Sequence, residues 1–222
     1  MFNAFDRITI EVPDLSAART SYSSLLGLFS SSGDLALGNV GLALREVSGL
    51  TQARIARLGL WDDSLPRGVG ETLDGGPLAI PLERSHTRDG HYREALTETG
   101  IYAVDHVVLQ SRDADACIAL FRDQLGLRLA LDQTVPEFGG RMLFFRAGKM
   151  TLEVIQHLET PPSQDFFWGI TYLCRDIDAT LAELDRRGVN HSPVRSGRKP
   201  GTRVATVKSH CLDLPTLLIG PA

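Results

Sequence analysis

The chain has 222 residues, 43% of them hydrophobic, which is enough to bury a core in one or two domains. A formal net charge of −4 and a pI near 5.9 argue against nucleic acid or an anionic membrane as the main partner. Three scattered cysteines exclude a disulfide framework and predict reduced thiols in a cytoplasmic protein. We expect no secretory signal at the start of the chain, and no apolar run approaches the ~20 residues of a membrane span.

The first predicted unit covers residues 5–46. Residues 5–14 align without a gap with residues 104–113, so that Asp14 falls on Asp113. Self-similarity of this kind indicates repeated structural units, because each copy must bury the same face.

A further copy is expected between residues 50 and 100, with residues 57–62 as its first strand. The following stretch is rich in proline and glycine, which a helix does not tolerate. We therefore predict an irregular insertion and linker over residues 64–100, with a short helix at 92–96. This copy is either collapsed or absent.

The central unit, residues 103–157, is predicted to form a strand, a helix and three more strands. Apolar residues repeat at helical spacing over residues 114–125, and Gly126 ends that helix. The strands cover residues 104–109, 127–131, 141–146 and 150–155.

The last predicted unit covers residues 168–220 and follows the same order. A strand ending at Asp176 precedes an amphipathic helix over residues 177–187, which Gly188 ends. Residues 203–208 and 216–219 supply later strands.

Four segments in this order carry a resemblance to a known family: Asp-His-Val-Val-Leu from residue 105, Arg-Asp-x-Asp from 112, Leu-Gly-Leu from 125 and Thr-Leu-Glu-Val from 151. The set resembles the vicinal oxygen chelate superfamily, which includes glyoxalase I, bleomycin-resistance proteins, methylmalonyl-CoA epimerase and extradiol dioxygenases. The resemblance implies an α+β fold in which repeated βαβββ modules pair into a curled, cup-shaped mixed sheet with helices outside.

The resemblance also implies two domains. Residues 1–100 would form a degenerate glyoxalase-like domain that contains the module 5–46. Residues 101–222 would form a paired-module domain from modules 103–157 and 168–220.

In this family the first strand of a module donates a histidine to a metal and the last strand donates a glutamate or glutamine. The central module has His106 and Glu153 at these positions. The corresponding positions hold Gly169 and Leu218 in the C-terminal module, and Arg7 and Ala43 in the N-terminal one. Two ligands alone hold a divalent cation weakly.

Three additions would complete such a site: His157, His210, or the His106 and Glu153 of a second copy in a homodimer. The metal would be Mn, Fe, Ni or Zn, and a metal-free protein is equally compatible with the sequence.

Cationic and aromatic residues suggest a ligand that is anionic with an apolar body. Arg198 and Arg203 belong to a run of four cations over residues 195–203, which is typical either of an anion-binding loop or of a solvated hairpin. Arg141 and Trp168 are further candidates for substrate binding.

Two functions remain open. One is metal-dependent lyase or isomerase chemistry similar to glyoxalase, with Glu153 as ligand or catalytic base and His106 as ligand. A dioxygenase fits less well, because Gly169 replaces the histidine that the resemblance requires. The alternative is a metal-free binding or sequestering protein of the bleomycin-resistance type.

Overall fold

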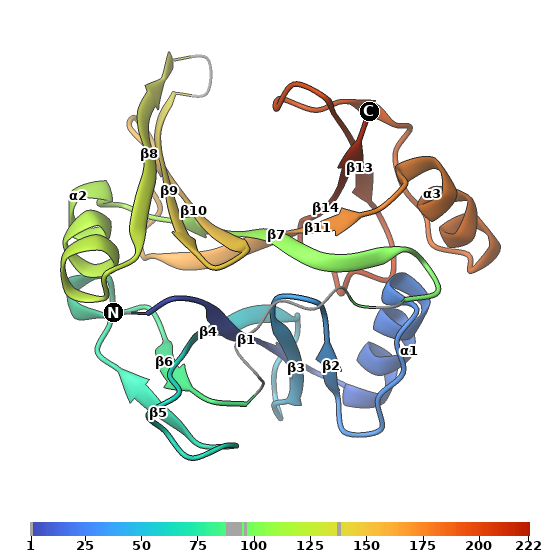
Figure 1. The fold of residues 1–222 in the computed structure, drawn as a ribbon, viewed down its shortest axis with the longest axis horizontal. Helices are drawn as coiled ribbons and strands as arrows, with labels where there is room; N and C mark the ends of the chain where they lie inside the picture. The colour runs from blue at the N-terminus through green and yellow to red at the C-terminus, as the bar shows by residue number, and fades with distance from the viewer. Residues whose placement is uncertain (1, 88–94, 96, 137–138) are drawn as a thin grey trace.

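The computed structural model describes residues 2–87, 95, 97–136 and 139–222. In these residues fourteen strands form one mixed sheet, whose main path runs β2-β3-β1-β4-β11-β7-β10-β9-β8. The sheet curls into two concave faces that open in opposite directions, with the helices on the outside (Figure 1). The α+β fold with a curled sheet, predicted from the sequence, is confirmed.

The central unit contains β7 (Ile101–Gln110), α2 (Ala114–Cys117), the π-helical segment η2 (Ile118–Gln124), β8 (Arg128–Val135), β9 (Gly140–Ala147) and β10 (Met150–His157). The last strand, β10, returns to pair in parallel with the first, β7. The even-numbered residues Met150, Leu152 and Val154 are buried. The alternate residues of β10 therefore face the concave side, because side chains alternate along a strand.

The C-terminal unit repeats this order with β11 (Phe166–Cys174), α3 (Ile177–Arg186), β12 (Arg195–Ser196), β13 (Thr202–Val207) and β14 (Thr216–Pro221). Its last strand, β14, again pairs in parallel with its first strand, β11. The first strands β7 and β11 pair antiparallel, so the two units join within one chain.

The N-terminal half begins with β1 (Phe5–Val12), α1 (Leu15–Leu26), β2 (Asp34–Ala36) and β3 (Gly41–Glu46). It continues with β4 (Arg54–Trp61), β5 (Gly70–Leu73), a short 3-10 turn η1 (Gly76–Leu78) and β6 (Leu82–Ser85). Strand β4 pairs antiparallel with β1 and parallel with β6. The segment β4–β6 is thus a unit that has kept its strand pairing and has no α-helix between its described strands.

Two stretches of the segment predicted to be irregular, 64–100, therefore form strands. Proline and glycine exclude a helix there but permit the short strands β5 and β6 between them. The helix predicted at 92–96 lies outside the described residues except for residue 95. The division into two domains near residue 100 stays a prediction.

The same aspartate cap begins each of the three α-helices in the described part of the chain. Asp14, Asp113 and Asp176 each accept a hydrogen bond from the backbone N–H three residues later, over distances of 2.9 to 3.0 Å. An aspartate at this position satisfies one of the N–H groups that a helix start leaves without a partner. The alignment of Asp14 with Asp113 in the sequence therefore marks a repeated structural feature.

All three cysteines are buried free thiols. Among the described residues no helix combines the length and apolar character needed to cross a membrane.

Candidate functional site

Four polar side chains meet at the floor of the upper concave face: Asp105, His106, Glu153 and Thr171. We call them the His106 cluster. His106 lies on β7, and its neighbours on either side in the sheet are Thr151 on β10 and Thr171 on β11. Glu153 lies two residues past Thr151 and points to the same face. Three adjacent strands therefore bring the cluster together, although Thr171 is 65 residues from His106 in the chain.

The imidazole of His106 contacts all three other members. Its Nδ1 lies 2.8 Å from the Asp105 Oδ2, and its Nε2 lies 3.3 Å from the Glu153 Oε2. The Thr171 hydroxyl lies 2.9 Å from the same Nε2. Because an ionised Asp105 can only accept hydrogen bonds, it keeps a proton on Nδ1. Nε2 is then the nitrogen that faces the Glu153 carboxyl and the Thr171 hydroxyl.

The Glu153 carboxyl is largely removed from water, with 13% of its side chain exposed. This burial raises its pKa above the ordinary glutamate value, while the charges of His106 and Arg198 oppose the rise. A carboxyl that burial makes harder to ionise, placed next to an imidazole, forms a pair of groups between which a proton can pass.

Of the other predicted residues, Arg198 acts on the cluster through its charge, and Trp168 lies on the same strand as Thr171. Arg198 is in the loop between β12 and β13, and its charge acts on Glu153. Trp168 occupies an irregularity in the pairing of β11, beside Gly169, and is 43% exposed.

The structure does not bring Arg141 or Arg203 to the cluster. Arg141 forms ion pairs of 2.8 Å with Asp115 on α2 and with Asp132, so it lies on the helix-bearing side of the sheet. Arg203 pairs with Asp178 on α3 at 2.6 Å. Each guanidinium group therefore links a strand to a helix on the outer side of the sheet.

The position predicted for the missing glutamate of the C-terminal module needs a correction. Leu217, not Leu218, lies opposite Thr171 in the sheet, as Glu153 lies opposite Val108 in the central unit. Leu218 is fully buried on the other face. The sequence alignment missed this by one residue, which in a strand reverses the side that a residue faces.

The described residues of one chain do not complete the metal site that the resemblance implies. The described residues contain no group of three or more histidine, cysteine, aspartate or glutamate side chains that could hold a metal. At the second histidine position, a Cβ on Gly169 would lie only 2.7 Å from the Pro215 carbonyl oxygen. His157 is four residues beyond Glu153, roughly 13 Å along the strand. His210 contacts Ser209 in the loop before β14.

Sequence reasoning missed Asp105 and Thr171 as members of the cluster. Asp105 is adjacent to His106 in the sequence and could have been found as a partner of its ring. Thr171 could have been found only from the antiparallel register of β7 and β11, which the sequence does not specify.

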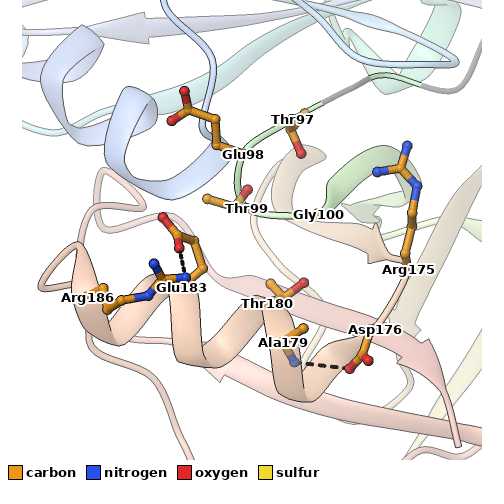
Figure 2. Close-up of a pocket in the computed structure, with 10 residues that line it drawn as sticks. All are labelled: Thr97, Glu98, Thr99, Gly100, Arg175, Asp176, Ala179, Thr180, Glu183 and Arg186. Atoms are coloured by element: carbon orange, nitrogen blue, oxygen red, sulfur yellow. Dashed lines mark hydrogen bonds and ion pairs between the residues drawn. The ribbon is translucent and has the colours of Figure 1, made fainter.

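A separate pocket of about 300 Å³ lies on the helix side of the sheet (Figure 2). It lies between α3 and the segment Thr97–Gly100 that leads into β7, and none of the predicted site residues lines it. The hydroxyls of Thr99 and Thr180 are buried there without a hydrogen-bond partner among the described residues.

Comparison with known proteins shows a family similarity for part of the chain and a similarity of fold for nearly all of it. The family model "Glyoxalase/Bleomycin resistance protein/Dioxygenase superfamily" matches residues 105–206. This segment, slightly less than half of the chain, is therefore similar in sequence to the vicinal oxygen chelate superfamily. The resemblance seen in the sequence is therefore confirmed. A comparison with curated protein sequences gave no match.

Two solved structures illustrate the similarity. A triple mutant of 4-hydroxymandelate synthase from Streptomyces coelicolor is 14% identical, with a TM-score of 0.70 over 99% of this chain and 93% of that chain. Methylmalonyl-CoA epimerase from Mycobacterium tuberculosis is 19% identical, with a TM-score of 0.48 over 58% of this chain and 93% of that one. The first extends the similarity of fold to nearly the whole of this chain.

Proposed function

We propose that this protein is an enzyme that moves a proton on a small organic molecule, as an isomerase or lyase does. One observation carries the proposal: a buried carboxyl, Glu153, contacts an imidazole whose other nitrogen is held by Asp105. Buried carboxyl–imidazole pairs of this kind are suited to general acid–base catalysis, because one group can hold a proton that the other gives up.

The reaction that fits this pair is removal of a proton next to a carbonyl group. The Glu153 carboxylate takes the proton, and the electron pair of the broken C–H bond moves to the carbonyl oxygen. That oxygen accepts a hydrogen bond from Nε2–H of His106 in its protonated form, which stabilises the developing charge. Return of the proton to carbon gives an isomer, and loss of a leaving group gives a lyase product.

The surroundings of the cluster favour an anionic substrate with an apolar body. The charge of Arg198 acts at Glu153, where it would attract a carboxylate or phosphate on the substrate. Phe166 and Trp168 at the start of β11 are 41% and 43% exposed, which leaves aromatic surface for an apolar body.

A divalent metal has no part in this proposal, because among the described residues only His106 and Glu153 stand at the ligand positions that the resemblance implies. A second copy could supply two more ligands in a homodimer, and that arrangement stays a prediction. Binding without chemistry, as in bleomycin-resistance proteins, is the alternative function.

The test is exchange of carbon-bound protons with D₂O, followed by ¹H NMR on a panel of 2-oxo acids, malonate half-esters and their thioesters. The wild type is expected to catalyse exchange of a carbon-bound proton in at least one compound of the panel. Glu153→Gln and His106→Gln are expected to lower the rate by about 10²–10⁴-fold. His191→Gln is the matched control, since His191 pairs with Asp185 on α3, away from the cluster.

Treatment with a chelator and reconstitution with Mn, Fe, Ni or Zn separates the alternatives. The proposal holds if exchange survives the chelator and is lost in both cluster variants. Exchange that needs an added metal would overturn it in favour of the metal-dependent enzyme. No exchange of any panel member by the wild type would overturn it in favour of a binding protein.

A further inference from the structure

The lower concave face carries a second polar cluster at the same place in the fold as the His106 cluster. Arg7 on β1 aligns with His106, and it lies opposite Gly59 on β4 as His106 lies opposite Thr171. Glu83 on β6 lies opposite Gly59, where the C-terminal unit has Leu217 opposite Thr171. The first half of the chain thus has a glutamate, Glu83, at the last-strand position where the C-terminal unit has Leu217.

The remaining two positions of the lower face complete the comparison. Arg57 lies opposite Thr9, as Gly169 lies opposite Val108. Ala43, the counterpart of Glu153, contributes only a methyl group. The lower face therefore has two arginines and one glutamate where the upper face has one histidine and one glutamate.

These three side chains contact one another. The Arg7 Nε and Nη2 lie 3.2 Å and 2.8 Å from the Glu83 Oε1, and the Arg57 Nη1 lies 3.2 Å from the Glu83 Oε2. Glu83 is buried, with 6% of its side chain exposed, whereas Arg57 is 45% exposed. The carboxylate is thus enclosed between two guanidinium groups, and the outer one faces solvent.

A glycine on β4 permits this arrangement. A Cβ on Gly59 would lie 2.8 Å from the Ser85 Oγ and 3.3 Å from the Glu83 Oε1. Gly70 on β5 lies beside Arg7 and Glu83, and a Cβ there would meet both side chains at 3.7 Å, an ordinary contact. The strands β4 and β5 therefore pass close to the charged groups without covering them with side chains.

The charges of the cluster do not balance. Two guanidinium groups face one carboxylate, and each oxygen of that carboxylate is already hydrogen-bonded. Within the described part of the chain, the contacts of the cluster leave Nη1 of Arg7 and both Nε and Nη2 of Arg57 as donors. The nearby Glu11 does not compensate, because it pairs with Arg54 at 2.6 Å.

We propose that Arg7 and Arg57 form a binding site for a small oxyanion, a carboxylate or a phosphate, on the lower concave face. The Nε and Nη2 edge of Arg57 presents the two parallel donors that a carboxylate or phosphate accepts in bidentate fashion. Glu83 acts as a positioning residue, because it holds both guanidinium groups in place and sets the net charge at one positive unit. This site is independent of the His106 cluster and of its proposed chemistry.

The experiment is a titration of the full chain with acetate and, separately, with inorganic phosphate at constant ionic strength. The readout is the ¹H–¹⁵N signals of the arginine Nε–H groups, assigned with the variants. Saturable shifts of the Arg7 and Arg57 signals are expected with at least one anion. The stronger of the two titrations identifies the carboxylate or the phosphate as the preferred group.

Variants separate binding from a purely structural ion-pair cluster. Arg57→Gln removes the exposed donors and leaves the Arg7–Glu83 contact, so we expect at least about tenfold weaker binding with the fold intact. Arg54→Gln is the matched control, since it removes an arginine of the same strand that pairs with Glu11 instead. Arg57→Lys keeps the charge and loses the bidentate edge, and is expected to bind carboxylate more weakly than the wild type.

The proposal is overturned if neither anion gives saturable shifts of these signals in the wild type. It is equally overturned if Arg57→Gln, folded as judged by its spectrum, binds as tightly as the wild type. Equal weakening by Arg57→Gln and Arg54→Gln would indicate a general charge effect and would overturn the site as well.

Discussion

Replacing Gly169 by alanine tests why the C-terminal unit cannot contribute a ligand to the upper face. The added Cβ would lie 2.7 Å from the Pro215 carbonyl oxygen and 3.1 Å from the Pro215 Cβ. That oxygen also accepts the backbone hydrogen bond from the Ile170 N–H at 2.9 Å. The backbone around Pro215 must therefore move, and the move weakens a hydrogen bond between the first and last strands of the unit.

Overpacking of this kind costs about 1–3 kcal/mol of unfolding free energy. For a protein of this length, that loss lowers the melting temperature by roughly 2–12 °C. Urea unfolding followed by circular dichroism measures the free energy, and a thermal scan gives the second estimate. We expect no change in the slope of the unfolding free energy against urea concentration, because the surface exposed on unfolding stays the same.

Gly41→Ala is the matched control on β3. Its Cβ would lie 3.4 Å from the Asp6 carbonyl oxygen, which is an ordinary contact, so we expect a change below about 1 kcal/mol. Equal stability of the two variants would refute the reasoning. It would mean that Pro215 yields freely and that residue 169 could carry a side chain, including a metal-binding histidine.

Three further predictions follow from burial. Because burial raises the pKa of Glu153 in the folded state, the wild type should lose stability relative to Glu153→Gln as pH rises above the ordinary carboxyl range, measured by urea unfolding at several pH values; a constant difference between the two would contradict this. Burial raises the pKa of the Cys117 thiol to about 12, so the native protein should leave this thiol unmodified by a thiol reagent at pH 8, whereas the unfolded protein reacts. Asp6→Ala removes the acceptor of the hydroxyls of Ser85 and Thr87, at 2.7 and 2.6 Å, and should cost about 1–3 kcal/mol in urea unfolding, against less than half of that for Asp6→Asn.

The repeat and its strand order were predictable from the sequence because the same local signals recur. The aspartate caps at Asp14, Asp113 and Asp176 and the glycines that end the helices mark equivalent points of each unit. The hydrophobic spacing around α3 was likewise sufficient to place its helix, since one face packs on the sheet. The His106 and Glu153 pair was predictable because the family resemblance assigns ligand positions to the first and the last strand of a module, and these two residues occupy them.

The lower face was not predictable in the same way. The helix that marks each other unit is missing between the described strands β4 and β6, so the segment showed no helical spacing to align. Without that alignment, Arg57 and Glu83 had no assigned position. The register of β14 was also out of reach, since Leu217 and Leu218 are both leucine and only the pairing with Thr171 distinguishes them.

The parallel pairing of first and last strands has a consequence for the order of folding. In each complete unit, β10 reaches β7 and β14 reaches β11 only after the helix and two intervening strands have been spanned. Closing such a long loop costs chain entropy before any contact compensates for it, so we expect these pairings to form late in folding. The His106 cluster also depends on the antiparallel pairing of β7 with β11. It is therefore complete only when both units have folded. Damage to either unit should then reduce the population of competent molecules even when no cluster residue has changed.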